Sequence, residues 1–149
     1  MNDNMRRAYH ELTFGKIKRF MSKPQLSVIA DNLRGEEGDF FASKVLEIAG
    51  VIEAMPDTYE TDDQGTAAVV HLHYFRGTAD AWITEKDKGD GSHDDRQHQA
   101  FGLITLTGNK DDTELGYISI DELIENNVEL DLYWEPQTLD ELKQDGNGK

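Results

Sequence analysis

The fold is decided by five segments of the chain: AAVVHLHYF (67–75), DAWITEKD (80–87), FGLITLT (101–107), ELGYISI (114–120) and VELDLYW (128–134). They are rich in β-branched and aromatic residues and are bounded by turn-forming residues, which is typical of β-strands. They therefore predict a single antiparallel sheet of about five strands. Ser119 and Glu122 form a capping box, which predicts a short helix before the last strand. We expect an α+β fold.

Two helices are predicted before the sheet, at residues 22–33 and 40–52, where apolar residues recur at helical spacing. Alternation along the strands assigns the faces of the sheet. One face carries the apolar residues Val70, Leu72, Tyr74, Val128, Leu130, Leu132 and Trp134. We expect the N-terminal helices to pack on this face alone.

The opposite face of the sheet is the candidate binding face, with His71, His73, Asp131, Tyr133 and Glu135. Histidines two residues apart on a strand point the same way and, with a neighbouring carboxylate, could hold Zn²⁺. His98 or His93 from the loop at 88–99 could complete such a site. His and Tyr are also ordinary residues of a half-solvated sheet face. Because no further ligand stands at a fixed spacing, we expect neither a metal site nor a cofactor.

The length of 149 residues fits one domain. We assign residues 22–145 to this domain, residues 1–21 to a weakly ordered or helical extension, and residues 146–149 to a disordered tail. Residues 88–99 contain no apolar side chain and predict an exposed, mobile loop. The chain has no cysteine, no apolar run that could span a bilayer and no signal peptide, so we expect a cytoplasmic protein without membrane contact.

Charge is distributed unevenly along the chain. Residues 1–34 carry seven Lys and Arg against three acids, and residues 35–149 carry eight against 27, which gives net charges of +4 and −19. The acidic body repels phosphates, so we expect no direct binding of nucleic acid, and it attracts basic protein surfaces. Acids in the predicted loops form the expected interaction surface: Asp62, Asp63, Asp111 and Asp112. Solubility alone also explains an acidic surface.

The sequence contains no glycine-rich phosphate loop, no serine elbow and no cysteine nucleophile. Three classes of function stay open. The first is a non-catalytic acidic protein that binds a host or defence protein, with nucleic-acid mimicry as one form of it. The second is a small metal- or carboxylate-dependent enzyme that uses the face around His71 and His73. The third is a structural or regulatory interaction module. The charge distribution favours the first.

The amino-acid sequence of the predicted strands also resembles a family, domain of unknown function 2958, over roughly residues 55–139. The resemblance rests on a signature of eight residues: Trp82, Glu85, Phe101, Gly102, Glu114, Leu115, Gly116 and Tyr117. It implies an accessory protein of a bacterial plasmid, integrative element or phage, acting in the bacterial cytosol, with no catalytic residues to carry over. The chain departs from the family at Leu130, where Arg is common. Gly102 and Gly116 lie inside strands, which predicts bulges or close backbone approach.

Overall fold

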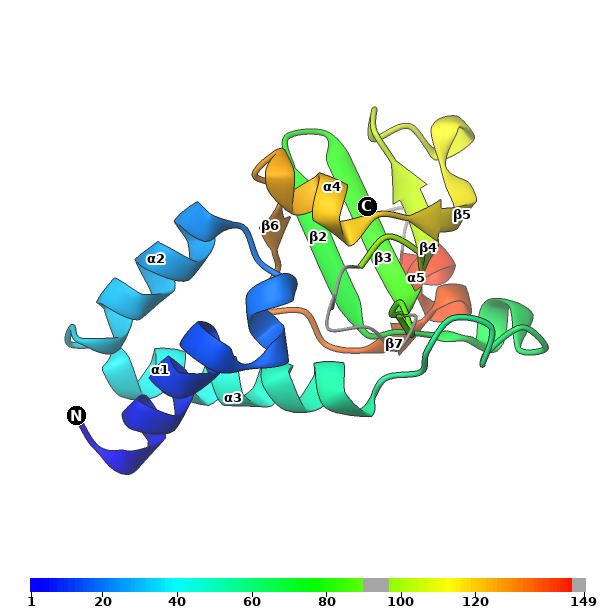
Figure 1. Cartoon of the computed structure of the whole chain (residues 1–149). Helices are drawn as coiled ribbons and strands as arrows, with labels where there is room; N and C mark the ends of the chain where they lie inside the picture. Colours follow the sequence, from blue (N-terminus) through cyan, green and yellow to red (C-terminus); the bar gives the residue numbers. More distant parts are fainter. Residues whose placement is uncertain (90–96, 146–149) are drawn as a thin grey trace.

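The computed structural model describes residues 1–89 and 97–145, and its first third is helical (Figure 1). The elements there are α1 (Asp3–Phe14), the 3₁₀ helix η1 (Lys16–Arg19), α2 (Lys23–Leu33) and α3 (Gly38–Ala54). The helices predicted at 22–33 and 40–52 are confirmed. The predicted tail at 146–149, and most of the loop predicted at 88–99, lie outside the described residues.

An antiparallel sheet of five strands follows, in the order β5-β4-β3-β2-β6. The strands are β2 (Leu72–Arg76), β3 (Ala79–Glu85), β4 (Ala100–Thr105), β5 (Glu114–Ile118) and β6 (Glu129–Leu130). A short helix, α4 (Ile120–Glu125), precedes β6, so the predicted α+β fold is confirmed. The remaining elements are η2 (Gly65–Ala67), η3 (Lys110–Asp112), α5 (Leu139–Asp145), and β1 (Val69–Val70) paired with β7 (Gln137–Thr138).

Local capping explains where the C-terminal helices begin. The Ser119 hydroxyl accepts the backbone N–H of Glu122 at 3.1 Å, at the start of α4. Before α5, the Glu141 carboxylate accepts the backbone N–H of Thr138 at 2.8 Å, and the Thr138 hydroxyl accepts that of Glu141 at 3.0 Å. These bonds satisfy N–H groups that have no partner within the helix, and so they fix both starting points.

The first 21 residues pack into the core and do not form a loose extension. Their apolar side chains are at most 6 % exposed at Ala8, Leu12, Ile17, Phe20 and Met21. The Tyr74 hydroxyl of β2 donates a hydrogen bond to the backbone carbonyl of Phe20, which ties this segment to the sheet. Few large apolar residues stand in α1, because it buries one narrow stripe against α3, and its pattern in the sequence is correspondingly weak.

The main core lies between the N-terminal helices and one face of the sheet. The sheet contributes Leu72, Tyr74, Ala81, Ile83, Ala100, Ile118 and Leu130, and the helices contribute Ile29, Leu33, Val45, Ile48 and Ile52, among others. The predicted packing of these helices on the face of Leu72 and Leu130 is thereby confirmed. Leu132, which the sequence placed beside them, is only partly buried at the margin of this core.

The second face of the sheet carries an apolar cluster of its own. The first and last predicted strands each contribute residues to both clusters, so the single face predicted for each of these strands is wrong. Val70 belongs to this second cluster with Trp82 and Leu139, whereas Leu72 belongs to the main core. The predicted first strand breaks at His71, so that β1 pairs with β7 and β2 pairs with β3. Val70 and Leu72 therefore do not share a face.

The predicted last strand is also shorter than expected. β6 ends at Leu130, and the chain turns after it because the Asp131 carboxylate accepts the backbone N–H of Tyr133 at 2.9 Å. Trp134 reaches the second cluster, where its indole N–H donates to the Val70 carbonyl at 3.0 Å. Leu130 and Trp134 thus lie in different clusters, and the second face is partly covered by apolar side chains.

The backbones of β3 and β4 approach each other closely at Gly102. A Cβ atom there would lie 2.0 Å from the Trp82 carbonyl oxygen, which confirms the predicted close approach. Beside it the register shifts between Ile83 and Glu85, and this bulge turns Glu85 to the same side as Phe101. At Gly116 a Cβ atom would meet no heavy atom within 4 Å, so the same prediction is wrong there.

Candidate functional site

His73 binds two carboxylates on the second face of the sheet. Its Nδ1 lies 2.9 Å from an Asp131 carboxylate oxygen, and its Nε2 lies 2.8 Å from one of Asp80. The ring of Trp82 stacks on the imidazole with centroids 5.6 Å apart, and the His73 side chain is 14 % exposed. Because both ring nitrogens already have a carboxylate partner, this group ties β2, β3 and the turn after β6 together.

The structure brings together only part of the predicted binding face. His73 and Asp131 are in contact, but His71 lies in the break between β1 and β2, and burial lowers its pKa. Tyr133 is 65 % exposed and Glu135 is also exposed, both beyond the end of β6. The five residues therefore do not form one continuous polar face.

The candidate metal ligands His71, His73 and His98, at which no site was expected, are not brought together either. Among the residues that the structure describes, no group of three or more His, Asp or Glu side chains is placed to hold a metal ion. His98 lies 3.8 Å from Asp121, next to α4, and His93 falls outside the described residues. The geometry therefore gives no support to a metal site built on His71 and His73.

The four predicted interaction acids flank the edge strand β5. Asp62 and Asp63 lie in the connection between α3 and η2, and Asp111 and Asp112 lie in η3; all four are exposed. η3 comes immediately before β5, while the other connection reaches the later part of β5 through Tyr59. Figure 1 places both segments (green and yellow) on the side of the sheet away from α1 and α2.

An aromatic cluster of Tyr59, Phe101 and Tyr117 lies beside β5. The hydroxyl groups of Tyr59 and Tyr117 are hydrogen-bonded, and their rings meet edge to face at 6.2 Å. Phe101 meets Tyr117 in the same way at 5.7 Å. The hydrogen bond with Tyr59 is the main cause that raises the pKa of Tyr117, and desolvation and the charges of Asp62 and Glu85 raise it further. Tyr59 and Tyr117 are 60 % and 55 % exposed, so this cluster is open to a partner.

Glu85 is a buried carboxylate that holds the connection in place. One oxygen accepts the backbone N–H of Tyr59 at 2.8 Å, and the other accepts the N–H of Thr61 at 3.0 Å as well as the Thr61 hydroxyl. Tyr59 has a φ of +79°, which is uncommon and unfavourable for a residue with a Cβ atom. Glu85 therefore stabilises a strained backbone that positions Tyr59 and the acids after it.

The residues of the predicted signature lie on three neighbouring strands. The register aligns Glu85 with Phe101 and Phe101 with Tyr117 across β3, β4 and β5, so these three share a side. Trp82 lies on the same side, opposite Leu103, and packs in the second cluster. Sequence reasoning missed Tyr59, which stands in a polar connector whose pattern shows no relation to β5. Sequence reasoning also missed Asp80, because only the pairing of β2 with β3 brings its carboxylate to His73.

The chemistry available beside β5 is that of a recognition surface for cations. Exposed carboxylates attract Lys and Arg, and aromatic rings bind the same groups by cation–π contact. A hollow of about 140 Å³ lies behind the cluster, lined by Thr61, Thr84, Glu85, Phe101, Leu115 and their neighbours. It is smaller than the roughly 300–1,000 Å³ of typical small-molecule sites. Two larger hollows, of about 620 and 460 Å³, lie beside α2.

A scan of protein-family models and searches of curated proteins and of solved structures found no match to this chain. Within residues 1–89 and 97–145, no helix has both the length and the apolar character needed to cross a membrane.

Proposed function

We propose that this chain is a non-catalytic acidic protein that binds a basic protein surface. The observation that carries the proposal is the separation of charge, with a net +4 over residues 1–34 and a net −19 over residues 35–149. The acids Asp62, Asp63, Asp111 and Asp112 stand on exposed connections at both ends of β5, where they can attract a partner without disturbing the core. Electrostatic attraction of this kind speeds association and favours a partner of opposite charge.

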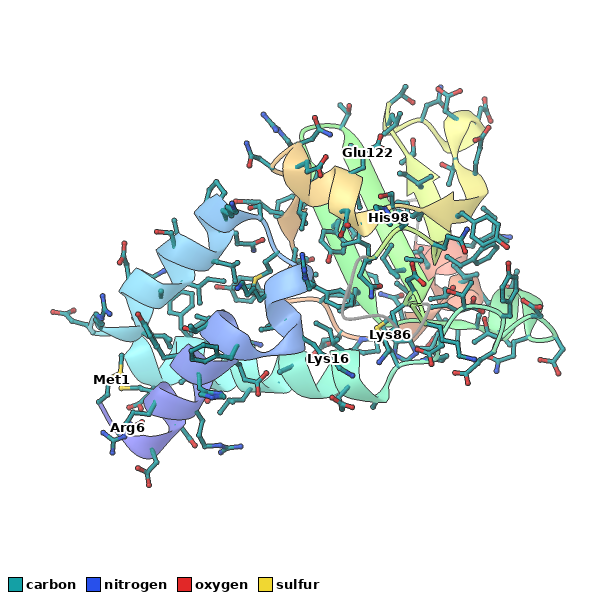
Figure 2. All side chains as sticks on the ribbon, viewed as in Figure 1. Met1, Arg6, Lys16, Lys86, His98 and Glu122 are labelled. Atoms are coloured by element: carbon teal, nitrogen blue, oxygen red, sulfur yellow. The ribbon has the colours of Figure 1, made fainter. Side chains whose placement is uncertain are left out.

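The arrangement of the basic residues supports the same proposal. Figure 2 shows Arg6 at the end of the molecule that α1 forms, and Lys16 and Lys86 near the C-terminal end of α3. The Lys86 ammonium donates to the carbonyls of Ile52 and Glu53 at 2.6 and 3.3 Å, which places a cation at a helix C-terminus. Arg6, Lys16 and Lys86 belong to α1, η1 and the segment after β3, so none of these three cations stands in η3 beside Asp111 and Asp112.

The resemblance described above adds a setting to this proposal: a bacterial mobile element whose accessory protein meets a host or defence protein. A partner that normally holds DNA would bind an acidic surface in place of phosphates, which is nucleic-acid mimicry. The metal-dependent alternative is less favoured, because both ring nitrogens of His73 already have carboxylate partners.

Neutralising the four acids should weaken capture of the partner. We expect the immobilised chain to retain a basic protein from bacterial lysate at about 0.1 M salt and to release it at 1 M, because the Debye length falls from about 10 to about 3 Å. The variant with Asp62, Asp63, Asp111 and Asp112 changed to Asn should retain about tenfold less of it. Duplex DNA in excess should compete for the same partner if the acids mimic phosphates.

A second variant provides the control, with the same change in net charge at exposed acids of α2, α3 and the connection between them: Asp31→Asn, Glu36→Gln, Glu37→Gln and Glu47→Gln. It should retain the partner as the unmodified chain does. Equal losses in the two variants, or capture that does not respond to salt, would contradict the proposal.

A further inference from the structure

The two edge strands of the sheet, β6 and β5, differ in whether their outer main-chain groups have hydrogen-bond partners. At the β6 edge, the side-chain amide of Gln25 in α2 pairs with Leu130 as a neighbouring strand would. Its NH₂ donates to the Leu130 carbonyl at 2.8 Å, and its oxygen accepts the Leu130 N–H at 3.0 Å. Unpaired edges invite the addition of another strand, and proteins commonly cover them in such ways. The β6 edge is therefore closed by a group from this chain.

The β5 edge has no such cover. Within the described residues, no side chain or loop backbone donates to or accepts from the main chain of Glu114–Ile118, which pairs only with β4. Leu115 and Tyr117 are 56 % and 55 % exposed, and at Gly116 nothing lies within 4 Å of where a Cβ atom would stand. β5 also contains neither Pro nor Lys, the residues that usually blunt an edge. It thus offers free hydrogen-bonding groups together with two exposed apolar side chains.

The charges around this edge select the occupant. Asp111, Asp112 and Glu114 lie at its beginning, and Asp62 and Asp63 belong to the connection that Tyr59 holds beside Tyr117. A second copy of this chain paired antiparallel along β5 would bring these two acidic groups against each other. A strand that carries Lys or Arg would instead meet opposite charge at both ends.

We propose that β5 receives an extended basic segment of a partner protein as an additional strand of the sheet. Main-chain hydrogen bonds to the free edge supply affinity, and the side chains at alternate positions supply selectivity. Apolar side chains of the segment contact Leu115 and Tyr117, and its cations contact the acids at both ends of β5. This proposal rests on the proposed function, because it names the surface and the kind of segment by which a basic partner binds.

The test uses the full chain and a labelled peptide of about six residues that alternates lysine and valine, the length of a typical strand. A second peptide has the same sequence with alternate backbone nitrogens methylated, so it keeps its charge but cannot pair along a strand. By fluorescence anisotropy, we expect the first peptide to bind at least about tenfold more tightly than the second, a difference of about 1.4 kcal/mol. Equal affinities for the two peptides would overturn the proposal.

The matched variants are Leu115→Lys on β5 and Val28→Lys on α2, whose wild-type side chains are 56 % and 58 % exposed. Leu115→Lys should weaken binding of the first peptide about tenfold, because it removes an apolar cross-strand contact and adds a like charge. Val28→Lys should leave that affinity unchanged. Equal effects of the two substitutions would overturn the edge proposal. In that case, weaker peptide binding by the variant with Asp62, Asp63, Asp111 and Asp112 changed to Asn would still uphold the proposed function. Sedimentation that shows a dimer abolished by Leu115→Lys would assign the edge to a second copy and would also overturn the proposal.

Discussion

Gly102→Ala should destabilise the protein by about 3 kcal/mol, because the added methyl group cannot be accommodated between two paired strands. A Cβ atom at this position would lie 2.0 Å from the Trp82 carbonyl oxygen, 2.9 Å from its carbonyl carbon and 3.0 Å from the Ile83 Cα. All three are backbone atoms, so no side chain can turn away to make room. β3 and β4 are neighbouring inner strands of the sheet, with β2 on the far side of β3 and β5 on the far side of β4. Forcing β3 and β4 apart would therefore disturb the whole sheet. Thermal unfolding should show a midpoint lower by about 6–12 °C.

Gly116→Ala is the control for this prediction. Gly116 stands opposite Gly102 in the register, and a Cβ atom there would meet nothing within 4 Å. Alanine should therefore be neutral or should stabilise by up to about 1 kcal/mol, because it restricts the unfolded chain. Similar midpoints for the two variants would show that the close approach at Gly102 is not a constraint on the fold.

Glu85→Gln should destabilise the protein by about 2–3 kcal/mol and release the connection that carries Tyr59. The carboxylate accepts from three donors, the backbone N–H groups of Tyr59 and Thr61 and the Thr61 hydroxyl, and it is 2 % exposed. Glutamine replaces one acceptor oxygen with an NH₂ group, which leaves at least one of these donors facing another donor. Urea unfolding measures the loss, and amide exchange at Tyr59 and Thr61 should become faster.

The pKa of Tyr117, followed by the absorbance of its phenolate, distinguishes the release of Tyr59 from general destabilisation of the fold. The hydrogen bond with Tyr59 is the first cause that raises the pKa of Tyr117, so that pKa should return toward its usual value when the connection moves. Glu114→Gln, an exposed acid on β5, should change the free energy of unfolding by less than about 0.5 kcal/mol. If Glu85→Gln resembles Glu114→Gln in both measurements, the buried carboxylate does not hold the connection.

Periodicity in the sequence was sufficient to predict the sheet and the helices that cover it. The alternation around Leu72 and Leu130 and the helical spacing at 22–33 and 40–52 each have one physical cause, a single buried face. The second apolar cluster could not be predicted in this way. It depends on a break at His71 and on the turn that Asp131 caps, and both are decided by tertiary contacts that no local pattern records.

In the candidate site, too, one part could be predicted from the sequence and another could not. The acids Asp62 and Asp111 were predictable, because charged residues in glycine-containing connectors lie in exposed loops. The contacts that position them were not, because Tyr59 reaches Tyr117 across 58 positions and Glu85 reaches Thr61 across 24. A metal site at His71 and His73 was an alternative that spacing alone allowed, and we did not expect it. It assumed an uninterrupted strand, whereas the structure breaks the strand at His71 and pairs both nitrogens of His73.

The most direct test of the account is a map of the surface that a basic segment contacts. Backbone ¹H–¹⁵N chemical shifts of the intact chain would be followed while the lysine–valine peptide is added. We predict that the largest shifts occur at Glu114–Ile118 and in the flanking segments that carry Asp62, Asp63, Asp111 and Asp112. Shifts spread evenly over the acidic residues of the chain, or largest on α1, α2 and α3, would contradict the claim that basic partners bind at β5.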